Sequence, residues 1–281
     1  MSGRIDEILE FGNKLPSFPA AVSEAIRLLA DDNTSNDRIV AVLQRDQGLV
    51  AQILKLSNSA FYGVSRRVST VKQALLVLGR NAVRSLVVSV AAQEYLGRPQ
   101  PGYLLERGAL WQHSMAAGIA AALIAQRVQY RPADEAFVAG LLHDIGKVVL
   151  SEYLARHSED IVARLGDPAA VSFDVIEREL VGVDHATLGA MLADHWQLPP
   201  RLGQAIRFHH CPGEAGDDWM LPALVHGANA LTLAVGVGLG VDGLQTTLDE
   251  QALLRLGLVE GDLELLADEL LQKLAEEEAG A

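Results

Sequence analysis

Cysteine is almost absent from this chain: Cys211 is the single one among 281 residues. One cysteine cannot form an internal disulfide, and this composition is typical of a protein from a reducing compartment. Aromatic residues make up only 5% of the chain while alanine and leucine dominate, which favours helices over a β-sandwich. Basic residues are also scarce, 23 against 36 acidic ones, for a formal net charge of −13. This balance argues against a general nucleic-acid-binding protein.

The N-terminus has no uninterrupted apolar stretch of the kind that a secretion signal needs. One segment is long enough to span a bilayer: the 23 residues between Asp218 and Asp242 carry no charged side chain apart from His226. His226 and Asn229 lie one helical turn apart there, which is more typical of an interior site than of a lipid-facing surface. We therefore interpret the segment as a buried helix that runs into a glycine-rich turn. A cytoplasmic protein without membrane contact is expected.

Apolar positions at three- and four-residue spacing predict helices along most of the chain. The chain is 49% apolar and 21% charged, which excludes a disordered protein. Helices are predicted from Ile39 onward and over 71–92, 109–128 and 136–150, and the polar residues 31–37 offer a helix N-cap before Ile39. The GRPQPG segment at 97–102 is the clearest linker. The predicted fold is all-α, with an N-terminal lobe over 1–100 and a second lobe over 101–281 that ends in acidic helices.

Charge is distributed unevenly along the chain. From Asp249 to the end there are ten acidic and two basic residues. Residues 47–93 carry no acidic residue and six basic ones: Lys55, Arg66, Arg67, Lys72, Arg80 and Arg84. Both stretches could be ordinary solvated surface. Alternatively, the basic stretch is a docking face for an anionic signalling protein or for the chain's own acidic end.

The strongest indication of chemistry is the segment LLHDIGK at 141–147. His143 and Asp144 are adjacent there, between an apolar helical stretch and a glycine, so that an imidazole and a carboxylate lie together beside the core. Both groups are ligands of divalent metals such as iron, manganese or zinc. Lys147 follows His143 by four residues and is well placed to meet a phosphate oxygen.

Further histidines lie in other predicted helices. His113 precedes the His143-Asp144 pair by thirty residues, and His185 and the pair His209-His210 follow it. A single histidine on an apolar helix is more often a hydrogen-bonded core residue than a metal ligand. Several of them in separate helices favour a shared site. Cys211, directly after His210, could ligate a soft metal, although an unreactive thiol in a turn is the simpler interpretation.

The spacing of His113, His143 and Asp144 resembles that of the HD superfamily of metal-dependent phosphohydrolases. Other segments resemble the HDOD domain, a relative found in bacterial signalling proteins. These segments are LPSFP at 15–19, QRDQGL at 44–49, LSNSAFYG at 56–63, ALLVLG at 74–79, WQLP at 196–199 and the pair His209-His210. The resemblance covers roughly residues 10–260, nearly the whole chain.

The resemblance implies an all-helical, two-lobed regulatory domain, related to the HD-GYP cyclic-di-GMP phosphodiesterases but without demonstrated hydrolase activity in most members. It places His113, His143 and Asp144 at metal-binding positions, and His185, His209 and His210 near those of a second metal. An HD hydrolase has an aspartate in its final helix where this chain has Asn229, and the Gly-Tyr-Pro segment of the HD-GYP relatives is missing. A neutral amide is a poorer ligand for a metal that must activate water and hold phosphoryl oxygens.

Two functions from different classes remain. The leading hypothesis is a signalling module that binds a protein partner or a small ligand, in which the His/Asp cluster is a metal or structural site. The alternative is a metal-dependent phosphohydrolase acting on a nucleotide or cyclic dinucleotide, with Asp144 and Lys147 as its catalytic residues. Asn229 favours the first hypothesis, and the retained histidines keep the second open. Direct nucleic-acid binding through residues 47–93 is disfavoured by the negative total charge.

Overall fold

The computed structural model describes residues 15–59, 62–64, 66–165, 172–245 and 248–280. Over these ranges every regular element is a helix, apart from one isolated β-bridge between Gln100 and Leu105. The prediction of an all-α fold is therefore confirmed. Residues 1–14 and residues 60–61 of the LSNSAFYG segment lie outside the described ranges.

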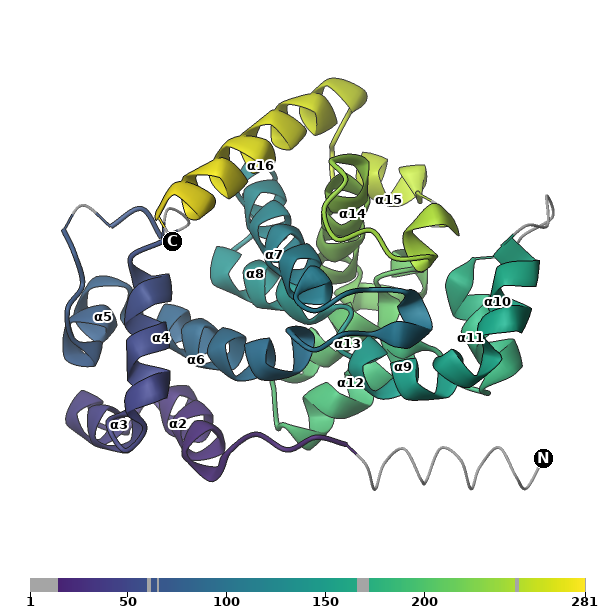
Figure 1. Cartoon of the computed structure of the whole chain (residues 1–281). Coiled ribbons are helices and arrows are strands. Elements are labelled where there is room, and N and C mark those ends of the chain that lie inside the picture. Colours follow the sequence, from purple (N-terminus) through teal and green to yellow (C-terminus); the bar gives the residue numbers. More distant parts are fainter. Residues whose placement is uncertain (1–14, 60–61, 65, 166–171, 246–247, 281) are drawn as a thin grey trace.

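The helices form two neighbouring groups in chain order (Figure 1). The first group is α2 (Ala20–Ala30), α3 (Asn36–Leu43), α4 (Gln47–Ser57), α5 (Val71–Val77) and α6 (Gly79–Leu96). The second begins with η1 (Pro101–Tyr103), α7 (Ala109–Arg127), α8 (Ala133–Leu142), α9 (Lys147–Leu154), η2 (Ala155–His157), α10 (Ser158–Leu165) and α11 (Phe173–Leu180). It continues with α12 (His185–His195), α13 (Pro200–Phe208), η3 (Pro212–Asp218), α14 (Met220–Ala234), η4 (Asp242–Gln245), α15 (Glu250–Arg255) and α16 (Glu260–Gly280).

The LPSFP and WQLP segments hold the start of the described chain against the second group. Phe18 stacks on Trp196 with ring centroids 4.0 Å apart. The Trp196 indole N–H donates to the Pro16 carbonyl oxygen over 2.7 Å, and the Tyr95 hydroxyl donates to the Ser17 carbonyl oxygen over 2.8 Å. The contacts of Pro16 and Phe18 with Trp196 cross the boundary predicted at residue 100. The division into domains at that residue stays a prediction.

Three of the long predicted helices are broken; the break within 136–150 belongs to the candidate site described below, and a local feature explains each of the other two. The helix predicted from Ile39 is divided because the Asp46 side chain accepts a hydrogen bond from the Leu49 N–H over 3.0 Å and so caps a new helix, α4. The helix predicted over 71–92 is divided at Gly79, whose φ of +87° is left-handed. The helix predicted over 109–128 is confirmed by α7.

The apolar segment between Asp218 and Asp242 forms α14, which packs against α7, α8 and α13. Leu224, Val225 and Ala228 of this helix are fully buried, and the chain leaves it through Gly236 at a φ of +81°. The interpretation as a buried helix followed by a glycine-rich turn is confirmed. Within the described ranges, the length and apolar character that a bilayer crossing requires do not coincide in any helix.

The six basic residues of 47–93 have different surroundings. Arg80 donates to the carbonyl oxygens of Leu28, Asp31 and Thr34 over 2.7–2.8 Å, and so satisfies acceptors at the end of α2 and in the turn that follows it. Lys72 forms an exposed ion pair with Asp37. Arg80 therefore serves the fold, whereas Arg66 lies exposed at the surface.

The acidic C-terminal helix reaches the basic stretch. In Figure 1, α16 (yellow) runs across the molecule and its last turns lie beside the end of α4. A cavity of about 790 Å³ between them is lined by Lys55 and Arg67 on one side and by Glu276 and Glu277 on the other.

Candidate metal-binding site

The HDIG sequence forms a turn between α8 and α9, inside the helix predicted over 136–150. A Cβ at Gly146 would lie 1.9 Å from the His185 carbonyl oxygen, so only glycine lets this turn approach α12 so closely. The turn ends α8 and places His143 and Asp144 in the interior, where they are 0% and 1% exposed. The predicted continuous helix is therefore wrong at the residues that matter most for chemistry.

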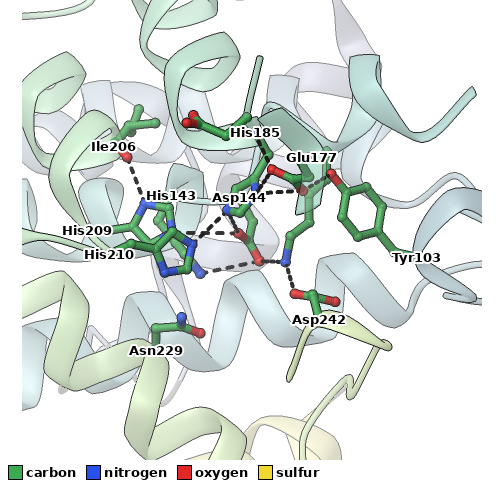
Figure 2. Close-up of polar contacts among 12 residues, drawn as sticks. Tyr103, His143, Asp144, Glu177, His185, Ile206, His209, His210, Asn229 and Asp242 are labelled. Atoms are coloured by element: carbon green, nitrogen blue, oxygen red, sulfur yellow. Dashed lines mark hydrogen bonds and ion pairs between the residues drawn. The ribbon is translucent and has the colours of Figure 1, made fainter. Parts of the chain in front are cut away.

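Asp144 lies at the centre of a cluster of imidazoles, with His143, His209 and His210 on one side in Figure 2 and Glu177 and Tyr103 on the other. The Nε2 atoms of four histidines approach its two carboxylate oxygens. The distances are 3.3 Å for His143, 3.4 Å for His185, 3.6 Å for His113 and 3.9 Å for His209. Side chains from α7, from α12, from the HDIG turn and from the residue that follows α13 therefore converge on one carboxylate, although they are far apart in sequence.

Charge keeps Asp144 ionised in this interior. Burial opposes ionisation, but His143 and the ammonium of Lys147 outweigh it and hold the pKa of Asp144 well below its usual range. A buried carboxylate that stays anionic among imidazoles is a strong ligand for a divalent cation.

Backbone carbonyls fix the orientation of two of the rings. His143 Nδ1 donates to the Gly140 carbonyl oxygen and His209 Nδ1 donates to the Ile206 carbonyl oxygen, both over 2.7 Å. Because a carbonyl oxygen only accepts, Nδ1 carries the proton in each ring and the lone pair of a neutral ring lies on Nε2. Both Nε2 atoms are buried without a hydrogen-bond partner. This orientation is typical of histidines that ligate metals.

Between His113 and Asn229, two acceptor atoms also face each other. His113 Nδ1 donates to the Val237 carbonyl oxygen over 3.1 Å, and His113 Nε2 lies 3.0 Å from Asn229 Oδ1. Burial lowers the pKa of His113 and so favours the neutral ring. The Nε2 lone pair then faces an amide oxygen, and either a turned amide or a cation between the two acceptors would satisfy both.

Glu177 orients His185 on the other side of the cluster. This fully buried carboxylate accepts hydrogen bonds from His185 Nδ1 (2.8 Å), from the His185 backbone N–H (2.7 Å) and from the Tyr103 hydroxyl (2.6 Å). Burial would lower the pKa of His185, but Glu177 outweighs this effect and raises it to about 9. His210 Nε2 lies 2.9 Å from His185 Nε2.

Lys147 is held by two carboxylates. Its ammonium donates to Asp144 Oδ2 and to Asp242 Oδ2, each over 2.5 Å, and only 5% of its side chain is exposed. Burial opposes the charged form, but the two carboxylates outweigh it and raise the pKa of Lys147 above its ordinary value. In this conformation the ammonium contacts two carboxylates, and the contact of Lys147 with a phosphate oxygen stays a prediction.

Tyr103, Glu177 and Asp242 belong to none of the sequence motifs described above. Glu177 lies eight residues before His185, but a glutamate in a helix is too common for that spacing to distinguish it. Asp242 is the first charged residue after the long uncharged segment. That position is the only sequence feature that could have drawn attention to it, and it is a weak one.

Two other polar residues near the cluster serve the fold. His226 Nδ1 donates to the His209 carbonyl oxygen over 2.7 Å, and His226 Nε2 accepts from the Asp249 N–H over 2.8 Å, so this side chain fixes the backbone that carries His209. Cys211 belongs to neither ligand group. Burial and the nearby Glu214 raise the pKa of its thiol to about 11, which favours the unreactive thiol that the sequence suggested.

The predicted ligand residues form two groups that could each hold a metal ion. In each group the candidate ligand atoms all lie within 4.8 Å of one another; the groups are His113, His143 and Asp144, and His185, His209 and His210. Asn229 lies beside the first group through His113. Imidazole nitrogen with carboxylate oxygen is a donor set that suits iron, manganese or zinc. The residues present therefore fit a metal.

Comparison with known proteins identifies the family of this chain. The HDOD domain pattern matches residues 15–212. A protein of Treponema pallidum (strain Nichols) is 31% identical over 216 residues, which are 75% of this chain and 39% of that protein, so the chain spans about two fifths of its relative's length.

Solved structures with the same fold cover almost the whole chain. An HDOD domain protein from Geobacter sulfurreducens has a TM-score of 0.73 at 27% identity and covers 99% of this chain and 97% of its own. A candidate signal-transduction protein from Marinobacter aquaeolei VT8 has a TM-score of 0.72 at 25% identity and covers 99% of this chain and 65% of its own. A candidate phosphohydrolase from Shewanella amazonensis SB2B has a TM-score of 0.71 at 24% identity over 96% of this chain and 95% of its own. With its helices, its HDIG turn and the matched pattern taken together, the chain belongs to the HDOD domain family.

Proposed function

We propose that this chain is a cytoplasmic signalling module whose His/Asp cluster holds a divalent metal ion as a binding centre and does not turn over a substrate. One observation carries the proposal: the Nε2 atoms of His143 and His209 are buried, oriented by backbone carbonyls and without a hydrogen-bond partner. Leaving a buried ring nitrogen without a hydrogen bond costs about 1–3 kcal/mol. A bound cation removes this cost.

The first ion is assigned to His113, His143 and Asp144, and a second to His185, His209 and His210. When bound, such ions supply Lewis-acid stabilisation of anionic oxygens. The chain's own groups prepare the rings: the Gly140 and Ile206 carbonyls hold His143 and His209, and Glu177 holds His185. Partners of this kind typically change metal affinity by about 10–100-fold.

Two features support binding without hydrolysis. Asn229 offers a neutral amide where an HD hydrolase has a carboxylate, which weakens the hold on the metal. The ammonium of Lys147 is already neutralised by Asp144 and Asp242, so it offers little charge to a phosphoryl group.

The second candidate function is a metal-dependent phosphohydrolase acting on a nucleotide or cyclic dinucleotide, with Asp144 and Lys147 at the reacting group. The intact cluster of five histidines and one aspartate favours it. Cyclic-di-GMP signalling would then be the context of the activity.

Metal titration combined with a turnover assay separates the two candidates. We expect Mn²⁺, Fe²⁺ or Zn²⁺ to bind the wild-type protein and His143→Ala to lose that binding, with no metal-dependent hydrolysis of cyclic di-GMP or simple nucleotides by either. Robust hydrolysis by the wild type that His143→Ala abolishes would establish the enzyme instead. Equal metal binding by the two proteins would refute the assignment of the site.

We further propose that an anionic signalling partner binds where Lys55 and Arg67 line the cavity beside α16. Poly-glutamate is a suitable probe of this charge complementarity. Its binding should weaken with salt and should be lost when Lys55 and Arg67 are both changed to Gln. Lys72→Gln is the matched control, because that ammonium is already paired with Asp37. Binding that survives the double change would refute this location.

A further inference from the structure

Residues 235–242, here called the strap, lie against the candidate metal site. They leave the end of α14 and make two contacts with the cluster: the Val237 carbonyl oxygen accepts from His113 Nδ1, and Asp242 Oδ2 accepts from the Lys147 ammonium. A third contact joins the Val241 N–H to the Tyr103 carbonyl oxygen over 3.2 Å. The position of the strap is therefore tied to the residues of the site.

Gly238 allows the strap to lie close to α7. A Cβ at Gly238 would lie 2.6 Å from the Ala109 carbonyl oxygen and 2.7 Å from His113 Cβ. Gly238 also has a left-handed φ of +61°, which residues other than glycine rarely adopt. Any larger residue at this position would push the strap away from α7.

Little apolar surface holds the strap down. Leu239 is 51% exposed, and the valines at 235, 237 and 241 are only partly buried. Segments with few buried apolar contacts and a polar attachment open at low free-energy cost. The strongest single attachment is the ion pair between Asp242 and Lys147.

Asp242 is also the point at which the ion-paired group meets solvent. Its side chain is 15% exposed, against 5% for Lys147 and 2% for Asp144. Two carboxylates already neutralise the one ammonium, and a third anion beside them would be repelled. An anionic group from outside can therefore reach Lys147 only by displacing Asp242.

We propose that the strap is a gate. When it is closed, the Asp242 carboxylate binds the Lys147 ammonium, and when it opens, an anionic group of a bound ligand takes the place of that carboxylate. This inference rests on the proposed binding function and adds its regulation. A ligand with a phosphate-type group would exchange one carboxylate for its own oxygens and release the strap in the same step.

Inorganic phosphate is the probe that tests the gate, with Asp242→Asn and Gly238→Ala as two independent variants of the full chain. Asp242→Asn removes the competing charge and keeps the shape, whereas Gly238→Ala keeps Asp242 and prevents the strap from seating. Calorimetry should give at least tenfold tighter phosphate binding for both variants than for the wild type. Hydrogen exchange at the strap amides should be at least tenfold faster in both, while helix content by circular dichroism is unchanged.

Adding Lys147→Met to Asp242→Asn should abolish the gain in phosphate affinity. Wild-type phosphate affinity and wild-type exchange in both single variants would overturn the gate, as would a gain that survives Lys147→Met. Metal titration of the same proteins keeps the two proposals apart, because strap exchange is measured in metal-free protein. If neither the wild type nor any variant binds metal, the proposed function is refuted. The phosphate affinities and the exchange rates still decide whether the gate is supported or overturned.

Discussion

Replacing Lys147 by methionine should be among the most destabilising single changes in this chain. The ammonium lies 2.5 Å from Asp144 and 2.5 Å from Asp242, and its side chain is 5% exposed. Methionine fills a similar volume, but it leaves the carboxylates of Asp144 and Asp242 without the ammonium that pairs with both. Breaking a buried ion pair by removing one partner costs about 3–5 kcal/mol. For a chain of this size, that cost corresponds to a fall in melting temperature of roughly 6–10 °C.

Urea denaturation of metal-free protein, followed by circular dichroism, measures this cost. Lys72→Met is the matched control, because the pair between Lys72 and Asp37 has side-chain exposures of 59% and 78% and should contribute less than about 1 kcal/mol. Adding Asp242→Asn to Lys147→Met should recover part of the loss, since one stranded charge disappears. If Lys147→Met costs no more than Lys72→Met, the reasoning about a shared buried ammonium is refuted.

Three further predictions concern the cluster itself. Adding Mn²⁺ or Zn²⁺ at about 100 times its dissociation constant should stabilise the wild type by about 2.7 kcal/mol in thermal denaturation, and an equal gain in His143→Ala would contradict the ligand assignment. Asn229→Asp should bind metal at least about tenfold more tightly by calorimetry, because a carboxylate replaces an amide beside His113; unchanged affinity would place Asn229 outside the coordination sphere. In metal-free protein, stability should fall as the pH rises from 6.5 through about 9, because the raised pKa of His185 keeps a proton in the folded state that the unfolded chain has released. Glu177→Gln should flatten this slope in urea denaturation at several pH values, and an unchanged slope would exclude His185 as its source.

The sequence was sufficient for the helical fold and for the identity of the histidines. Apolar spacing predicted α7, and the uncharged segment between Asp218 and Asp242 predicted the buried α14. The breaks at Asp46 and Gly79 were missed because a single capping carboxylate or a single left-handed glycine overrides a continuing apolar pattern.

The polar partners of the site were beyond the sequence for a different reason. Tyr103 and Asp242 meet the cluster through tertiary packing, over separations of 74 residues for the bond between Tyr103 and Glu177 and 95 for the pair between Lys147 and Asp242, whereas Glu177 reaches His185 across the connection between α11 and α12. Local patterns report on neighbours along one helix and contain no information on which distant acid comes to rest beside a lysine. The motif therefore identified the candidate ligands, and the structure identified what orients and covers them.

The metal content of the purified protein tests the central claim most directly. Elemental analysis by mass spectrometry should find about one to two equivalents of iron, manganese or zinc in the wild-type protein, or after incubation with these ions and desalting. The same treatment of His143→Ala should leave markedly less metal, because His143 contributes one of the two buried Nε2 atoms that lack a hydrogen-bond partner. Wild-type protein that retains no more metal than His143→Ala would contradict the account.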